Sequence, residues 1–233
     1  MQVITFRLYD SVPRQIIDQW KTILLQKSTG SAGVLAHKQE KKGNAGVLAR
    51  TAIDDNKVNI AANEAGGDAR APQDKDVQKK MRKLIDDYED KGYGQCFFRD
   101  NRIAELMERA LFHYEGKHYK LVRWVIMPNH VHVMIVLKPG VTLSTIVQEW
   151  KSYTAHAANR LLGRKGDFWM PEFYDRYIRD NKHMANAIAY IDANPVKAGI
   201  AQNPNDYRWS SAYHEDKEQG TAEQGTAGVP ARK

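Results

Sequence analysis

The chain has 233 residues, with 35 lysines and arginines against 28 aspartates and glutamates, and a formal net charge of +7. Its apolar share, 42%, is enough for one domain with a core, and no apolar run approaches the roughly 18 residues that a membrane-spanning helix needs. The single cysteine, Cys96, excludes an internal disulfide and any multi-cysteine metal site. The first residues lack the pattern of a secretory signal, so we expect a cytoplasmic, nucleoid-associated protein.

The first elements are a strand and a helix. Residues 3–8 alternate in the manner of a strand and end in turn-forming residues, and the apolar spacing of residues 13–26 predicts a helix. The composition then changes. Residues 27–72 are rich in Gly, Ala, Asn, Asp and Lys, show no sustained period, and repeat the phrase Ala-Gly-Val-Leu-Ala. We expect a disordered insert there and a disordered tail over residues 214–233, around a single domain formed by residues 1–26 and 73–213.

After the insert, the spacing of apolar residues predicts helices and strands in alternation. Pro195 is expected to end the last helix, because a residue that precedes proline is disfavoured in the α region. The helices are predicted over residues 74–90, from the cap Asp100 to about residue 112, and over 143–162 and 182–194; the strands over 119–127, 130–137 and 168–178. Together with the first strand, this order predicts an α+β fold, a ferredoxin-like antiparallel sheet backed by helices.

The positive charge is concentrated in the middle of the chain. Residues 117–184 carry 11 basic and 5 acidic side chains, whereas residues 1–116 carry 19 and 17. Several tryptophans and tyrosines lie between these basic residues, a composition that suits a groove for nucleic acid, because cations contact phosphates and aromatic rings stack on unpaired bases. A solvated basic face is the alternative. Candidate phosphate contacts are Arg123, Lys151, Arg176 and Arg179.

Two histidines flank a single valine in the predicted strand 130–137. The period of two places His130 and His132 on one face of the sheet and Val131 on the other. Two imidazoles on one face could hold a metal ion, although a histidine pair packed without metal is the alternative reading of so short a motif.

A second group of polar residues lies on the last predicted helix. Asn186, Tyr190 and Asn194 follow one stripe of this helix, which we expect to face away from the core. A helix beside the histidine strand could direct the Tyr190 phenol and the Asn194 amide to the same centre. A metal ion held by His130, His132 and Asn194, with Tyr190 as nucleophile, would be equipped to cleave a phosphodiester. An ordinary amphipathic helix is the alternative.

Four phrases occur in the order and spacing of a known family. They are WVIMPNHVHV from Trp124, WKSYT from Trp150, WMPEFYDRYIR from Trp169 and AYIDANPVKAG from Ala189. Together they closely resemble the REP-associated tyrosine transposases, which are single-tyrosine transposases of the HUH endonuclease superfamily. The insert has no counterpart in the compact members of that family, which leaves open whether this copy is active.

The resemblance implies a ferredoxin-like or RRM-like nuclease core in which His130 and His132, with Asn194, hold Mg²⁺ or Mn²⁺. It implies that Tyr190 attacks single-stranded DNA at a palindromic hairpin and forms a 5′-phosphotyrosine intermediate that later allows rejoining. Tyr153, Tyr174 and Tyr177 are the competing nucleophiles. The expected partner is single-stranded or hairpin DNA, and no association with a membrane is expected. The protein is expected to act as a monomer or homodimer.

Two other functions stay open at this point. A DNA-hairpin or RNA-binding module would keep the fold and the basic face without the chemistry, although the joint presence of the two histidines, Tyr190 and Asn194 favours an enzyme. A replication initiator or relaxase of the same superfamily would commonly carry a helicase domain, which 233 residues do not accommodate.

Overall fold

The computed structural model describes residues 1–28 and 72–217. The chain divides into two compact units, one formed by residues 1–18 and 82–233 and the other by residues 19–81. Within the described residues, the second unit contributes only the later part of α1 (Arg14–Ser28) and the first part of α2 (Pro72–Glu89). Most of the predicted insert, residues 27–72, and of the predicted tail, residues 214–233, lies outside the described residues. The first unit carries the sheet and the candidate site.

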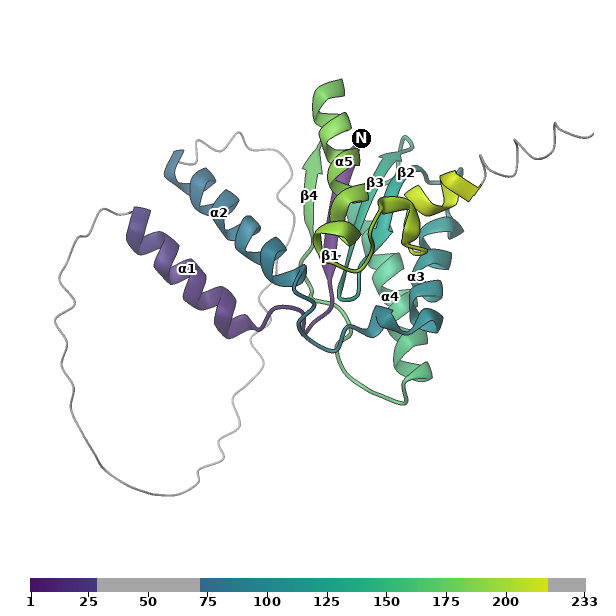
Figure 1. Ribbon diagram of the computed structural model, residues 1–233, viewed down its shortest axis with the longest axis horizontal. Helices are drawn as coiled ribbons and strands as arrows, with labels where there is room; N and C mark the ends of the chain where they lie inside the picture. Colours follow the sequence, from purple (N-terminus) through teal and green to yellow (C-terminus); the bar gives the residue numbers. More distant parts are fainter. Residues whose placement is uncertain (29–71, 218–233) are drawn as a thin grey trace, which may run out of the picture. The chain divides into compact units, whose positions relative to one another are not determined.

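A four-stranded antiparallel sheet forms the centre of the first unit (Figure 1). Its strands are β1 (Gln2–Arg7), β2 (Tyr119–Ile126), β3 (His130–Leu137) and β4 (Tyr174–Tyr177), in the order β2-β3-β1-β4. Each neighbouring pair is antiparallel. With helices connecting β1 to β2 and β3 to β4, this is the order of a ferredoxin-like sheet. The predicted α+β fold is confirmed.

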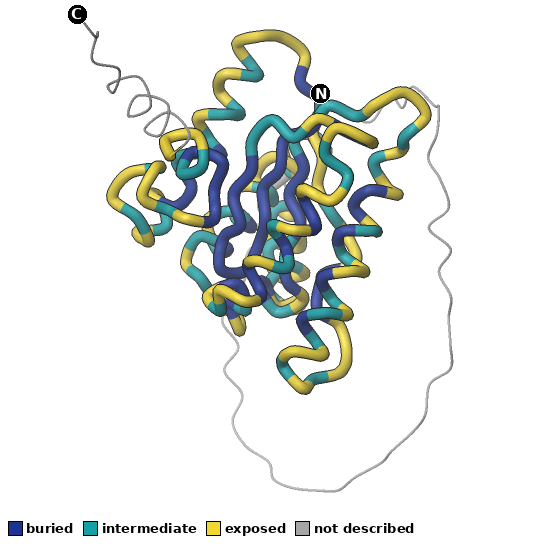
Figure 2. The backbone as a smooth tube through the Cα atoms, turned by 90° about the vertical axis from the view of Figure 1, so that its right-hand side faces the viewer, coloured by how far each residue is buried: buried dark blue, intermediate teal, exposed yellow. Residues whose placement is uncertain are grey.

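Two helices cover one face of the sheet. They are α3 (Asn101–His113), which the Asp100 side chain caps by accepting a hydrogen bond from the Arg102 amide, and α4 (Leu143–Leu161). The large side chains between them and the sheet are fully buried, among them Phe6, Trp150 and Tyr119. Figure 2 shows the resulting run of buried backbone through the central strands. This face holds the main hydrophobic core.

The other face of the sheet packs against α5 (Asn181–Lys197). The apolar contact there is small, because Val125, Met127, Met134 and Ile191 are its only fully buried members within the described residues. Short 3₁₀ turns lie at Phe97–Arg99 and Pro204–Asp206. Within the described residues, no helix has the length and apolar character that crossing a membrane requires.

The predicted strand 168–178 is wrong in its first half. Only residues 174–177 pair as β4, and Trp169 forms an isolated bridge with Leu8. The segment before β4 is held as a loop, because Pro171 has no amide hydrogen to donate and the Lys151 ammonium binds the carbonyl oxygens of residues 170, 171 and 172. Phe168 and Trp169 enter the core from this loop rather than from a strand.

Pro195 does not end the last helix, contrary to the prediction. It lies inside α5, which continues to Lys197. In the final turn the missing amide costs one hydrogen bond, and the Ala198 amide still donates to the Asn194 carbonyl oxygen at 3.0 Å. Gly199 follows with φ of 69°, a left-handed conformation suited to ending the helix.

The ordered domain extends beyond residue 213, where we predicted the tail to begin. Residues 211–217 are helical. Glu215 forms an ion pair with Arg123 of β2, and the His214 imidazole lies 2.9 Å from a Glu108 carboxylate oxygen on α3. Arg123 on β2 and Glu108 on α3 thus hold Glu215 and His214, which the composition of the segment had led us to place in the tail.

Candidate active site

Strand β3 presents both histidines to the face that α5 covers. His130 and His132 are 1% exposed, and Val131 and Val133 point into the main core on the opposite face, as the period of two predicts. Across the β1 pairing, His132 lies opposite Thr5 and His130 lies opposite Arg7. Directly opposed residues share a face of an antiparallel sheet, so Thr5 and Arg7 belong to the histidine face.

Polar neighbours orient both imidazole rings. The Asn129 side-chain amide donates to the carbonyl oxygens of Glu89 and Tyr93, which leaves its oxygen to accept from His130 Nδ1 at 2.8 Å. His130 Nε2 therefore carries a lone pair. His132 Nδ1 lies 2.8 Å from the Thr5 hydroxyl, and the Nε2 atoms of His130 and His132 lie 3.1 Å apart. Both rings thus turn their Nε2 atoms to one point.

This geometry fits a divalent metal ion. Two adjacent donors of an octahedral ion, each at about 2.1 Å, are about 3.0 Å apart, close to the observed 3.1 Å. Burial and the nearby Arg82 and Arg7 charges lower the pKa of His130 to about 3, and burial with the neighbouring His130 lowers the pKa of His132 well below its usual value. Both imidazoles are therefore neutral near pH 7, the protonation state that binds metal.

Asn194 supplies a further donor from α5. Its side chain is fully buried, and its amide nitrogen donates to the Tyr190 carbonyl oxygen at 2.6 Å. Its Oδ1 is buried without a hydrogen-bond partner within the described residues. The prediction that this polar stripe faces away from the core is wrong, because α5 turns Tyr190 and Asn194 toward the sheet. The orphaned oxygen is the kind of atom that a metal ion or its water would satisfy.

Among the described residues, no three His, Cys, Asp or Glu side chains are grouped in a way that could hold a metal ion. A metal centre here would accordingly use the two imidazoles and the Asn194 amide oxygen, with water or substrate oxygens completing the coordination.

Tyr190 lies beside the histidine pair. Its ring packs edge-on against the His132 ring, with 5.4 Å between the centroids, and the Lys197 ammonium lies 4.5 Å from the Tyr190 ring centroid. Burial raises the pKa of the Tyr190 phenol, and the Asp86 and Asp90 carboxylates raise it further. The phenol is therefore protonated at neutral pH, and a nucleophilic role requires that its proton leave during the reaction.

The sequence analysis missed the charged residues that α2 and β1 place around this site. The Glu89 carboxylate is 2% exposed, lies 3.6 Å from the Arg7 guanidinium, and carries two oxygens without hydrogen bonds within the described residues. Burial raises its pKa to about 7. Thr5 and Asn129 were also missed. Asn129 directly precedes His130, a signal that could have been followed, whereas nothing in the sequence links Thr5 or Glu89 to the histidines.

The four predicted DNA contacts divide into two pairs. Arg176 on β4 and Arg179 just before α5 are exposed. Arg123 pairs with Asp192 and Glu215, and Lys151 binds three backbone carbonyl oxygens, so internal partners hold both. We do not retain Arg123 and Lys151 as phosphate contacts.

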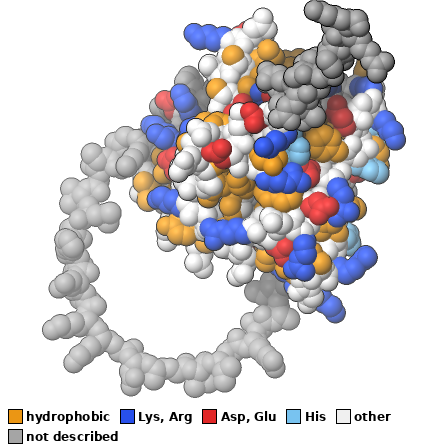
Figure 3. Space-filling view, turned by 45° about the vertical axis from the view of Figure 1, so that its right-hand side comes forward, with side chains coloured by type: hydrophobic (Ala, Val, Ile, Leu, Met, Phe, Trp, Pro, Cys, Tyr) orange, Lys and Arg blue, Asp and Glu red, His pale blue; other side chains and the backbone are white. Residues whose placement is uncertain are grey.

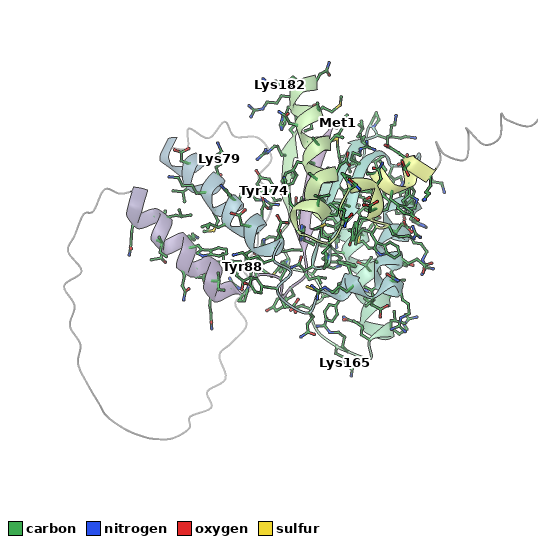
Figure 4. All side chains as sticks on the ribbon, viewed as in Figure 1. Met1, Lys79, Tyr88, Lys165, Tyr174 and Lys182 are labelled. Atoms are coloured by element: carbon green, nitrogen blue, oxygen red, sulfur yellow. The ribbon has the colours of Figure 1, made fainter. Side chains whose placement is uncertain are left out.

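The basic residues of the middle segment do not all lie at one place on the first unit. Figure 4 places Lys182, at the start of α5, and Lys165, in the loop after α4, at opposite ends of the first unit. On the face that Figure 3 presents, basic, acidic and hydrophobic side chains are intermixed. The net positive charge of this segment therefore does not by itself locate a binding surface.

The competing tyrosines lie in different surroundings. Tyr153 is 48% exposed on α4, on the far side of the sheet from the histidines. Tyr177 pairs with Gln2 of β1, whereas Tyr174 pairs with Thr5 and so shares the histidine face. Of the four, only Tyr190 has a described ring contact with a histidine of the pair.

Comparison with known proteins agrees with the resemblance. Residues 93–194 match the model of the family described as "Transposase IS200 like". A REP-associated tyrosine transposase of Escherichia coli (strain K12) is 31% identical over 103 residues, which span 44% of this chain and 59% of that protein. A putative REP-associated tyrosine transposase of Haemophilus influenzae is 26% identical over 126 residues, spanning 50% of this chain and 69% of that protein.

A similar solved structure is described as a REP-associated tyrosine transposase bound to a REP hairpin, with 28% identity, a TM-score of 0.43, and coverage of 50% of this chain and 68% of that chain. The match to the Escherichia coli protein spans 59% of that relative, which is less than two thirds of its length. The resemblance recognised from the four phrases is confirmed: residues 93–194 match the model of the IS200-like transposases, and the two relatives reported above are named as a REP-associated and a putative REP-associated tyrosine transposase.

Proposed function

We propose that this protein is a metal-dependent transposase that cleaves and rejoins single-stranded DNA at palindromic, REP-like hairpins through a 5′-phosphotyrosine intermediate on Tyr190. One observation carries the proposal. The Tyr190 ring packs against His132, whose Nε2 atom faces that of His130 across 3.1 Å. A tyrosine and two neutral imidazole nitrogens therefore share one buried face of the sheet, which supports roles as nucleophile and metal ligands.

The chemistry is a phosphoryl transfer. The Tyr190 phenolic oxygen attacks phosphorus and the bond from phosphorus to the 3′ oxygen breaks, which leaves the 5′ end on the tyrosine and a free 3′ hydroxyl. The phenol proton leaves as the new bond forms, and the departing 3′ oxygen takes up a proton. A 3′ hydroxyl that attacks the phosphotyrosine reverses the step, so rejoining requires no external energy source.

His130, His132 and Asn194 would hold the metal ion. When bound, it supplies positive charge that polarises the phosphodiester and stabilises the charge that develops in the transition state. We propose Mg²⁺ or Mn²⁺, and the donor set favours Mn²⁺, because imidazole nitrogen suits a transition-metal ion better than it suits Mg²⁺. Thr5 and Asn129 orient the two imidazoles and fix which nitrogen faces the ion.

The charged groups near Tyr190 have complementary parts in this reaction. The negative charges of Asp86 and Asp90 raise the Tyr190 pKa and so hold the proton on the phenol until the reaction begins. Arg82 and Lys197 both act on His132, and Lys197 lies over the Tyr190 ring, so we propose that they supply positive charge to the DNA phosphate. Arg176 and Arg179, both exposed, are the proposed contacts to the DNA backbone.

One chain contains every residue of the proposed site. His130 and His132 come from β3, and Tyr190 and Asn194 come from α5 of the same chain. We therefore propose that a monomer is competent for cleavage.

The test is a covalent-adduct assay with Mn²⁺ and labelled hairpin DNA from the flanks of the gene, analysed by denaturing electrophoresis. Wild-type protein should retain label, and EDTA should abolish the adduct. Tyr190→Phe should bind the hairpin with unchanged affinity but form no adduct, whereas the matched control Tyr153→Phe should form it normally. Hairpin binding by the wild type without any adduct would instead identify a non-catalytic DNA-binding protein.

A further inference from the structure

A small pocket opens beside Tyr190, on the side of α5 that faces β4. Its volume is about 230 Å³, and Tyr190 and Thr5 form the end next to the histidines. The other residues used below, all in the first unit, are Arg82, Tyr174, Arg176 and Asn186. Tyr174, labelled in Figure 4, and Arg176 lie on the same face of β4 as the histidine site, since they pair with Thr5 and Val3 of β1.

The wall opposite α5 is fixed by internal contacts. The Arg82 guanidinium lies 4.4 Å from the centroid of the Tyr174 ring, and its Nε binds an Asp86 carboxylate oxygen at 2.8 Å. Arg176 donates to the Tyr174 hydroxyl at 3.4 Å and lies 6.0 Å from the same ring centroid. An aromatic ring and two guanidinium groups are thus arranged at the pocket before any ligand arrives.

This combination of groups is the one that recognises an unpaired nucleotide. Tyr174 remains 40% exposed although Arg82 lies against its ring, so ring surface is available for stacking by a base. The guanidinium groups supply donors for phosphate oxygens, and the exposed Asn186 amide supplies both a donor and an acceptor for a base edge. The volume lies below the roughly 300–1,000 Å³ of drug-sized sites and so limits the occupant to about one base.

We propose that this pocket holds one unpaired nucleotide directly next to the phosphodiester that Tyr190 attacks. The inference rests on the proposed function, because Tyr190 forms one wall of the pocket and the attacked phosphate must lie at its oxygen. The Arg82 wall is supplied by α2, outside the residues 93–194 that match the family model. Because every base can stack on an aromatic ring, we expect the pocket to select for an unpaired base but to discriminate little between the four bases.

The test is a double-mutant cycle between the protein and the DNA. Equilibrium binding to hairpins with single-stranded flanks is measured for the full-length protein carrying Tyr190→Phe, which prevents cleavage, with and without Tyr174→Ala. Each flanking nucleotide is replaced in turn by an abasic site. Tyr177→Ala is the matched control, because Tyr177 lies on β4 but is paired with Gln2 and does not line the pocket.

We expect Tyr174→Ala to weaken binding of the intact DNA about tenfold, regardless of base identity at the position concerned. At one position adjacent to the cleaved bond, the abasic site should weaken binding by the protein that retains Tyr174 by about the same factor. Tyr174→Ala should then cause no additional loss of affinity for that abasic DNA. Tyr177→Ala should leave all affinities within about twofold.

Additive losses from Tyr174→Ala and abasic DNA at every position would overturn the inference and leave the proposed function intact. So would a Tyr174→Ala protein that binds all the DNAs as tightly as its parent. Failure of the Tyr190→Phe protein and the wild type to bind any hairpin or single strand would overturn the proposed function, and the inference with it.

Discussion

The two faces of the sheet show how one strand serves two purposes. On one face Val131 and Val133 of β3 pack under α3 and α4 with Phe6 and Trp150, and the Trp150 indole donates to the Tyr119 hydroxyl at 3.0 Å. On the other face the same strand presents His130 and His132.

The histidine face leaves several buried groups without full partners. The Asn194 Oδ1 and both Glu89 carboxylate oxygens have no hydrogen bond within the described residues. Unpaired buried polar groups cost free energy, so this face sacrifices stability, whereas the apolar face supplies it. The large apolar core therefore lies on the first face, whereas the second combines a small apolar cluster with the buried histidines and Asn194.

Removing an apolar group from the core face should have the largest effect on stability. Phe6 lies 4.9 Å from Trp169 and 6.0 Å from Trp150, measured between ring centroids, and is 1% exposed. Phe6→Ala should lower the free energy of unfolding by about 3–5 kcal/mol, as measured by urea denaturation. The folded fraction should bind Mn²⁺ as the wild type does. A cost below about 1 kcal/mol would show that this face is not the principal core.

A charge on the histidine face should make stability depend on pH. Because the pKa of Glu89 is raised to about 7 in the folded protein, its stabilising contribution is complete below the unfolded value near 4.5 and is lost as the pH rises through 7. Relative to wild type, Glu89→Gln should therefore gain about 3 kcal/mol in unfolding free energy between pH 4.5 and pH 8. Urea denaturation across this range measures the difference, and a constant offset would contradict the assignment.

Thr5, the neighbour of Phe6 on β1, should affect metal binding more than stability. Thr5 is directed to the histidine face, where its hydroxyl lies 2.8 Å from His132 Nδ1. Thr5→Val removes this partner at nearly constant volume, and Mn²⁺ affinity should fall about tenfold, which corresponds to about 1.4 kcal/mol. Unfolding free energy should change by no more than about 1 kcal/mol. Isothermal titration with Mn²⁺ tests this, and an unchanged affinity would remove Thr5 from the site.

Local patterns in the sequence predicted most of the fold and the histidine pair. Alternation placed His130 and His132 on one face, and helical spacing placed Tyr190 and Asn194 one turn apart. The errors arose where long-range contacts decide: Lys151 holds residues 170–172 out of the predicted strand, and Glu215 reaches Arg123 from the predicted tail. Thr5, which contacts His132, and Glu89, whose carbonyl oxygen accepts from the Asn129 side chain, lie far from the histidines in the sequence, so spacing patterns could not reveal them.

The most direct test of the account is to identify the residue that carries the DNA. The adduct formed with Mn²⁺ and a flanking hairpin would be digested with nuclease and protease, and the modified peptide would be sequenced by mass spectrometry. The account predicts a single nucleotidyl phosphate on Tyr190, absent when EDTA is added or when His132 is replaced by Ala. A phosphate on Tyr153, Tyr174 or Tyr177, or an adduct that persists in EDTA, would contradict it.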